Sequence, residues 1–123
     1  MRSLFAAIIL PTLMLAGCSG HASTDDPAAA EAAVRGLFDA FARRDCAEAM
    51  SYAGGTLLEG MKKEGCEHSI EELSGIRLTA VNKNSPDGRS KHTRLIHVRI
   101  AGNDSDSVIR LQLVDGRWRV VSL

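Results

Sequence analysis

The chain has 123 residues, of which 45% are hydrophobic and 24% are charged, and its 15 basic and 15 acidic residues give a formal net charge of zero. A neutral chain lacks the overall field that attracts nucleic acid, so no nucleic-acid partner is expected. The charges are unevenly distributed, because residues 18–75 hold five Lys or Arg against eleven Asp or Glu, and residues 76–123 hold nine against four.

The first 17 residues have the parts of a secretory signal peptide. Arg2 supplies a positive charge, and the apolar run from Leu4 to Leu15 is followed by small residues. This run of 12 residues contains a proline and is too short to span a membrane, which takes about 20 apolar residues. The stretch 15–18 (LAGC) matches the bacterial lipobox, which predicts cleavage before Cys18 and acylation of that cysteine.

Cleavage by the ordinary signal peptidase after Ala22 is the alternative, because Gly20 and Ala22 are small residues at the positions that this enzyme reads. Lipidation is favoured, since Cys18 directly follows the apolar run. Residues 18–26 would then form the lipidated cysteine and a flexible tether, and residues 27–123 a single domain. Ser19 is not the aspartate that retains Gram-negative lipoproteins in the inner membrane, so we expect an envelope protein of the outer membrane that faces the periplasm.

Export would place the two remaining cysteines, Cys46 and Cys66, in an oxidising compartment. An even number of cysteines predicts a disulfide there. Closing a loop of about 20 residues should stabilise the domain by roughly 3 kcal/mol. Two reduced thiols in the core are the alternative.

The first long periodic pattern predicts the main core helix. Asp26 suits the N-cap and Pro27 the first helical position, where a missing N–H costs nothing. Apolar residues then recur at spacings of three and four, which indicates one buried helix face. These residues are Ala30, Ala33, Val34, Leu37, Phe38 and Phe41.

Shorter helices are expected after this one. Asp45 and Glu48 have the spacing of a capping box for a second helix, which the glycines 54–55 would stop. Thr56 and Glu59 repeat that spacing and predict a third helix that continues to Lys63. The residues 69–73 can form one more helical turn.

From Ile76 the apolar period changes to two, which is typical of strands. Strands are expected at 76–81, 95–100, 109–113 and 117–123, separated by a turn at 84–88, a polar loop at 102–106 and a tight hairpin at Asp115-Gly116. Strands that follow helices predict an α+β fold, with the N-terminal helices packed on a curved, four-stranded antiparallel sheet.

The order of these elements resembles that of the nuclear transport factor 2-like group. The stretches 44–49 (RDCAEA) and 111–121 (LQLVDGRWRVV) and a cysteine pair like Cys46 and Cys66 are similar to those of small bacterial lipoproteins of this group. The resemblance covers residues 27–123. It implies a cone in which a bent sheet wraps a long helix and leaves a pocket at the open end, on a fold that serves enzymes, binding modules and assembly factors alike.

Catalysis on this fold would need an acidic base and an aromatic hydroxyl in the pocket, as in an isomerase or dehydratase. Tyr52 is the only tyrosine, and the inward positions of the expected strands carry no Asp or Glu. Asp39 and Asp45 fit surface and capping roles. We therefore expect a protein that is not an enzyme.

No metal or other cofactor is predicted. His92 and His97 are five residues apart on one expected strand and would point to opposite faces. Cys66 and His68 have no second pair of ligands at a suitable spacing.

One candidate interaction site remains, on the sheet. If the apolar residues of the central strands face the helix, the residues between them share the opposite face. Such a positive face could dock an acidic protein partner or the acidic half of a second copy, although a solvated outer face is the alternative. Trp118 is expected to lie in the core or to line a pocket. The candidate partner-binding residues are Arg77, His97, Arg99, Arg110 and Gln112.

The sequence therefore predicts an envelope-anchored lipoprotein that acts as a non-catalytic binding or interaction module, of an accessory or immunity type. It would meet the membrane through its lipid anchor and an acidic protein through its sheet. A carrier of a small apolar ligand and an isomerase- or dehydratase-like enzyme, both using the cone pocket, are the alternatives. The sequence does not determine the oligomeric state.

Overall fold

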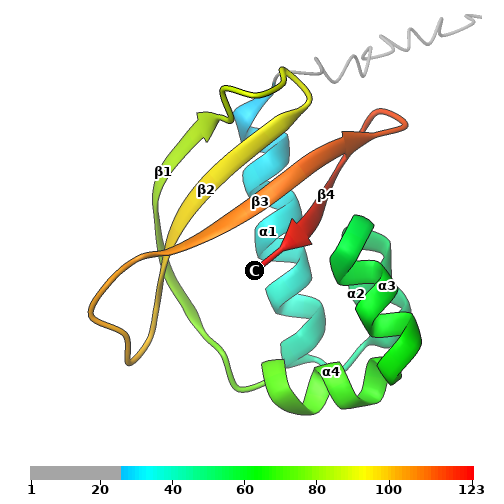
Figure 1. Cartoon of the computed structure of the whole chain (residues 1–123). Helices are drawn as coiled ribbons and strands as arrows, with labels where there is room; N and C mark the ends of the chain where they lie inside the picture. Colours follow the sequence, from blue (N-terminus) through cyan, green and yellow to red (C-terminus); the bar gives the residue numbers. More distant parts are fainter. Residues whose placement is uncertain (1–25) are drawn as a thin grey trace, which may run out of the picture.

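The computed structural model describes residues 26–123, so the expected signal peptide, Cys18 and most of the expected tether lie outside the described residues. The described chain is α+β, as predicted, with four helices followed by one open antiparallel sheet in the order β1-β2-β3-β4 (Figure 1). The elements are α1 (Pro27–Ala42), α2 (Cys46–Tyr52), α3 (Gly55–Glu64), α4 (Cys66–Leu73), β1 (Leu78–Pro86), β2 (Thr93–Ile100), β3 (Ser107–Val114) and β4 (Arg117–Ser122).

The start of α1 follows from its first two residues. Pro27 occupies the first turn, and the Asp26 carboxylate accepts a hydrogen bond from the Ala28 N–H at 2.9 Å. The apolar face that the sequence pattern predicts is buried in full, together with Ala40. Because α1 packs along one face of the sheet (Figure 1), this stripe forms half of the core.

The inner face of the sheet supplies the other half of the core. Every second residue of β2, β3 and β4 points toward α1, as the period of two predicts. Ile96, Val98, Ile109, Leu111 and Val120 are at most 1% exposed.

No helix in the described part of the chain is long and apolar enough to cross a membrane.

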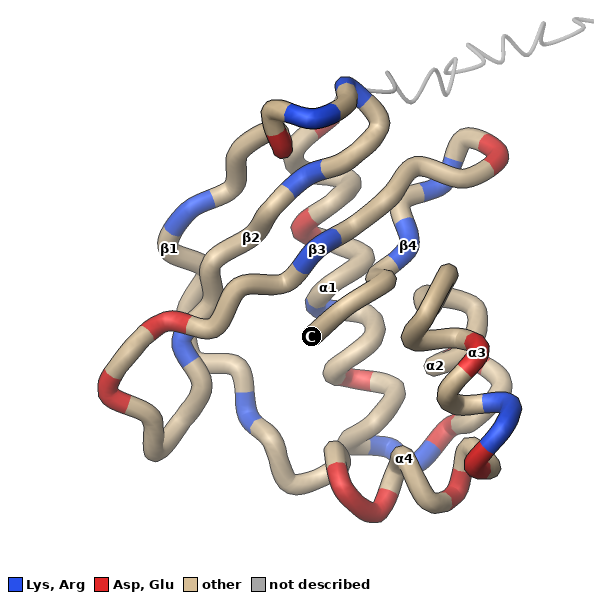
Figure 2. Tube along the Cα trace, viewed as in Figure 1, with Lys and Arg blue, Asp and Glu red and all other residues tan. Residues whose placement is uncertain are grey.

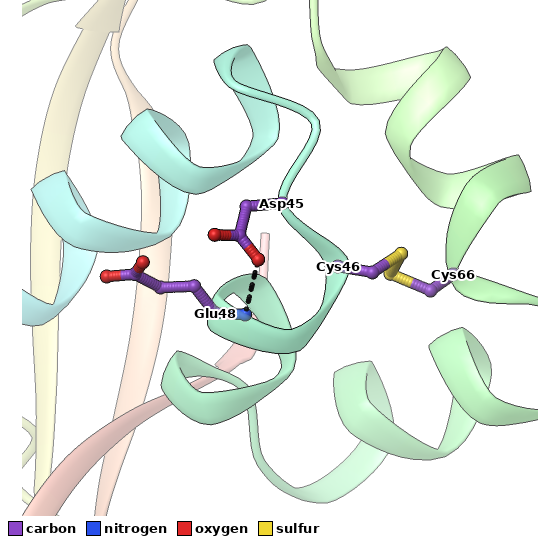
Figure 3. Close-up of a disulfide and its surroundings, with 4 residues drawn as sticks. All are labelled: Asp45, Cys46, Glu48 and Cys66. Atoms are coloured by element: carbon purple, nitrogen blue, oxygen red, sulfur yellow. Dashed lines mark hydrogen bonds between the residues drawn. A yellow bond between two sulfur atoms is a disulfide. The ribbon is translucent and has the colours of Figure 1, made fainter.

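The second helix begins as expected but with only half of the capping box. The Asp45 carboxylate accepts a hydrogen bond from the Glu48 N–H at 3.1 Å (Figure 3). The Glu48 carboxylate does not return this bond, because it lies 3.2 Å from the Arg43 guanidinium. Hydrogen bonds to Asp39 and Glu48 raise the pKa of Arg43.

The predicted cap of the third helix is wrong. The structure begins α3 at Gly55, one residue before Thr56, and no side chain caps it. The cause lies outside the helix: the Gly54 N–H donates to the Val120 carbonyl at 2.9 Å, so β4 fixes the chain just before the helix. The fourth helix is longer than the expected single turn and begins at Cys66.

The first hairpin also differs from its prediction. β1 continues to Pro86, and the turn expected at 84–88 occupies residues 87–92 instead. A proline is tolerated there because β1 is an edge strand. His92 therefore lies in the turn and not on the strand of His97, which corrects its predicted placement. The hairpin at Asp115-Gly116 is confirmed, with φ of 52° and 78°.

Candidate functional site

The disulfide expected between Cys46 and Cys66 is present, with the two Cα atoms 5.9 Å apart (Figure 3). Cys46 is the first residue of α2 and Cys66 the first residue of α4, so the bridge joins these two helices. The whole of α3 lies within the loop that it closes. The bridge therefore restrains α3, because it holds the start of α2 next to the start of α4.

Four of the five candidate partner-binding residues lie on the outward face of the sheet. The strand register pairs His97 with Val108, and Gln112 with Thr93. Arg110 lies opposite Leu95 on the same face. Arg77 does not join this group, because it precedes β1 and lines a cleft with residues of α1.

The positive charge of Arg99 is neutralised within the chain. Its Nε donates a hydrogen bond to the Asp106 carboxylate at 2.9 Å, and Asn82 donates to the same oxygen at 2.8 Å. These two hydrogen bonds hold the pKa of Asp106 below its usual value. Arg99 therefore presents less positive charge to a partner than its position in the sequence indicates.

Arg110 and Arg119 also have partners in their own chain. The Arg110 Nε lies 3.5 Å from a carboxylate oxygen of Asp87, whose side chain is only 8% exposed. The Arg119 guanidinium donates to the carbonyls of Ser51 and Ala53 at 3.1 and 3.3 Å, at the end of α2. The outward face is thus a network of internal contacts, which weakens the case for docking an acidic protein there.

A cleft of about 550 Å³ opens beside this face, between α3, α4, the end of β4 and Arg110 of β3. Its volume is within the range of small-molecule sites, about 300–1,000 Å³. Both apolar and polar side chains line it, which suits a ligand with an apolar body and a polar group. The lining residues are Thr56, Leu57, Gly60, Met61, Glu64, Ser69, Glu72, Leu73, Arg110, Val121, Ser122 and Leu123.

Arg110 is the residue that joins the sheet face to the cleft. Its contact with Asp87 is an ion pair without hydrogen-bond geometry, because the Arg110 Nε has no hydrogen-bond partner among residues 26–123. This Nε is buried and cannot reach a ligand, but the side chain as a whole is 41% exposed, so the other N–H groups of the guanidinium could donate to an acidic group. Glu64 and Glu72 lie on the opposite wall and are exposed to solvent.

Sequence reasoning missed this cleft, because two of its walls come from α3 and α4 and the others from β3 and β4, more than thirty residues further along the chain. Only Arg110 was among the predicted site residues. Gly60 lies on its wall, and a Cβ atom at position 60 would meet nothing within 4 Å, so the packing does not require glycine there.

Trp118 lies in the core, with 6% of its surface exposed. It also lines a smaller cleft of about 280 Å³ with Tyr52, Ala29 and Arg117. The indole Nε1 is buried and has no hydrogen-bond partner within the part of the chain that the structure describes. Tyr52 ends α2 and packs on α1 at Gly36.

The residues considered for catalysis and metal binding lie apart from one another. Asp39 forms an ion pair with Arg43 at 2.9 Å, and Asp45 caps α2. His68 pairs with Glu72 at 3.3 Å on α4. Among residues 26–123, no group of three or more His, Cys, Asp or Glu side chains has the arrangement of a metal site.

Comparison with known proteins gives no relative: no family model, no curated protein and no solved structure matches this chain.

Proposed function

We propose that this chain is a lipoprotein of the bacterial envelope, anchored through Cys18, whose domain is a non-catalytic binding module. The binding site is the cleft between α3, α4, the end of β4 and Arg110 of β3, which we call the α3–α4 cleft. Its ligand is a small molecule with an apolar body and an acidic group. The small-ligand carrier thus takes precedence over the module that docks an acidic protein.

The lipobox at 15–18 and the disulfide support the proposed location. A disulfide persists in oxidising compartments such as the periplasm and is rare in the cytosol. The export signal and the bridge between Cys46 and Cys66 both agree with a location outside the cytoplasm. Ser19 after the acylated cysteine favours the outer membrane in a Gram-negative host.

A nuclear transport factor 2-like cone is the proposed architecture. The order of helices and strands supports it, and so does the position of α1 along one face of the sheet (Figure 1). Register shifts in the β1–β2 and β3–β4 pairs also support it, because β-bulges bend a strand and increase its twist. The α3–α4 cleft is distinct from the pocket expected where the sheet wraps α1, because Arg110 faces away from α1 and no residue of α1 lines the cleft.

The single observation that carries the ligand proposal is the composition of the cleft. Leu57 and Leu73 are half-buried and Leu123 is 44% exposed, so these lining residues offer apolar surface to an apolar body. Arg110 supplies guanidinium donors at the rim. Burying apolar ligand surface contributes about 25 cal/mol per Å², and a charge-assisted hydrogen bond to Arg110 would fix the orientation.

Filling the cleft tests this proposal. Gly60→Phe places a ring where a Cβ atom meets no neighbour, and Gly60→Ala changes the helix in the same way without filling the cleft. Native mass spectrometry of the mature lipoprotein, purified gently from membranes, should detect a bound small molecule in the native protein and in Gly60→Ala. The molecule should be absent from Gly60→Phe.

Two outcomes would contradict the proposal. Protein that carries no small molecule, and whose Tm does not respond to any member of a panel of fatty acids and other amphipathic acids, would exclude the carrier. A ligand that survives Gly60→Phe would place the binding site elsewhere. Arg110→Gln should retain the apolar contacts. Its affinity for acidic ligands should fall about tenfold or more, because charged hydrogen bonds are worth about 1.5–3 kcal/mol.

A further inference from the structure

The β1–β2 hairpin lies beside the residue where α1 begins. Asn84 Nδ2 donates a hydrogen bond to the Pro27 carbonyl at 2.8 Å, and Figure 1 shows the hairpin next to the start of α1. Arg94 holds Asn84 in place, because its Nε donates to Asn84 Oδ1 at 2.8 Å and its side chain is buried. The tip of the hairpin and the point where the anchored segment enters the domain are therefore at the same end of the molecule.

The β1–β2 hairpin at this end of the domain is basic, and Asp26 at the start of α1 is an acidic neighbour. Residues 81–97 contain four Lys or Arg and one Asp, and that residue, Asp87, is buried and pairs with both Arg110 and Arg89, at 3.5 and 4.0 Å. Lys83, Arg89 and Lys91 are exposed, and we call these three residues the basic tip. Figure 2 shows basic residues along β1 and at the turn of the β1–β2 hairpin.

The opposite end of the domain is acidic. Residues 55–73, which form α3 and α4, contain two Lys and five Glu, and Figure 2 shows acidic residues along α4. The 16 residues of α1 separate the two ends by about 24 Å. Because the Debye length is about 8 Å at physiological ionic strength, a charged surface that meets one end hardly acts on the other.

We propose that the basic tip rests on the anionic phospholipid headgroups of the membrane in which Cys18 is anchored. The inference rests on the proposed lipoprotein, since the acyl chains keep the domain at the surface. Eight residues separate Cys18 from Pro27, and even fully extended they reach only about 30 Å, so the headgroups are always within reach of the hairpin.

Contact through the basic tip would orient the domain. Each Lys or Arg near an anionic surface raises the equilibrium constant for contact about fivefold. The acidic end is repelled by the same surface. Glu64 and Glu72, which line the α3–α4 cleft, belong to that acidic end. The cleft consequently opens toward the aqueous compartment and not toward the lipid, although the chain as a whole is neutral.

The four lysines that follow Cys18 make a test with an internal control. Lys83 and Lys91 belong to the basic tip, and Lys62 and Lys63 lie on α3 at the other end. The mature lipoprotein would be reconstituted in vesicles of phosphatidylcholine alone or with added phosphatidylglycerol, treated briefly with a water-soluble amine-acylating reagent and analysed by mass spectrometry. Labelling of the tip lysines should fall about fivefold or more on the anionic vesicles, and return at high salt, while the α3 lysines stay unchanged.

Charge reversal separates this effect from other causes of protection. Arg89→Glu with Lys91→Glu should abolish the protection of Lys83, and the matched control, Lys62→Glu with Lys63→Glu, should retain it. Equal labelling of Lys83 and Lys91 on both kinds of vesicle would overturn the inference. Protection that persists on phosphatidylcholine would also overturn it, since contact with a second copy or another protein would then be the cause.

The same spectra distinguish failure of this inference from failure of the proposed function. An acyl mass on Cys18 together with unprotected tip lysines leaves the lipoprotein intact and removes only the oriented contact. A chain without acyl mass on Cys18 removes the lipoprotein itself.

Discussion

Replacing Gly36 with alanine should destabilise the domain, although Gly36 lies in the interior of α1. Alanine has a higher helix propensity than glycine by about 1 kcal/mol, so propensity alone predicts a stabilising change. A Cβ atom at position 36 would, however, lie 2.7 Å from Cε1 of Tyr52. Adding a methyl group to a packed site costs about 1–3 kcal/mol, so we expect the free energy of unfolding to fall by up to about 2 kcal/mol.

Two comparisons isolate the contact with Tyr52. Gly60→Ala is the matched control, because Gly60 lies in α3 with open space around it, and this change should stabilise the domain by up to about 1 kcal/mol. In a Tyr52→Ala background the effect of Gly36→Ala should change sign and approach that of Gly60→Ala. Urea denaturation of each variant, with the slope m unchanged, measures these differences. If Gly36→Ala stabilises the native chain as much as Gly60→Ala does, the reasoning is refuted.

Three further changes test individual contacts. Replacing Cys46 and Cys66 together with alanine should lower the free energy of unfolding by roughly 3 kcal/mol, and an unchanged urea midpoint would contradict this. Asp45→Ala should cost about 1 kcal/mol, since the Glu48 N–H loses its acceptor, whereas Asp45→Ser should recover most of the loss in the same assay. Arg99→Gln should raise the pKa of Asp106 toward 3.8, measured by NMR titration of its carboxyl carbon. Folding lowers the pKa of Asp106, so the stability that its carboxylate contributes is present above the unfolded pKa and is lost as the pH falls through the folded pKa. The Arg99→Gln variant should therefore lose less stability below about pH 4 than the native protein. An equal loss would contradict the ion pair between Arg99 and Asp106.

Local signals in the sequence were sufficient for most of the elements. Asp26 and Pro27 determine the start of α1 through a side-chain hydrogen bond and a fixed φ angle, and both effects lie within one turn of the chain. The alternation along β2 likewise depends only on neighbouring residues. The start of α3 could not be read in this way, because a hydrogen bond from Gly54 to β4, more than sixty residues away in the sequence, decides it.

The candidate site was harder to predict than the fold. Alternation correctly indicates that Arg99 and Arg110 face away from α1, but it contains no information about their partners. Those partners, Asp106 and Asp87, lie in turns whose side chains carry no periodic pattern. The α3–α4 cleft depends on how two helices and two strands pack together, which no local pattern in the sequence encodes.

The two edges of the sheet have a consequence for a protein held at high density on a surface. Exposed strand edges invite pairing between molecules, and tethering many copies to one bilayer would favour such pairing. Here Ala53 and Gly54 cover the edge of β4 through the bond to Val120. At the other edge, β1 carries Pro86, the charge of Lys83 and two irregularities of register. Among residues 26–123, neighbouring copies thus meet no flat, open strand on which to stack, which would favour dispersed molecules over lateral aggregates if the chain is anchored as proposed.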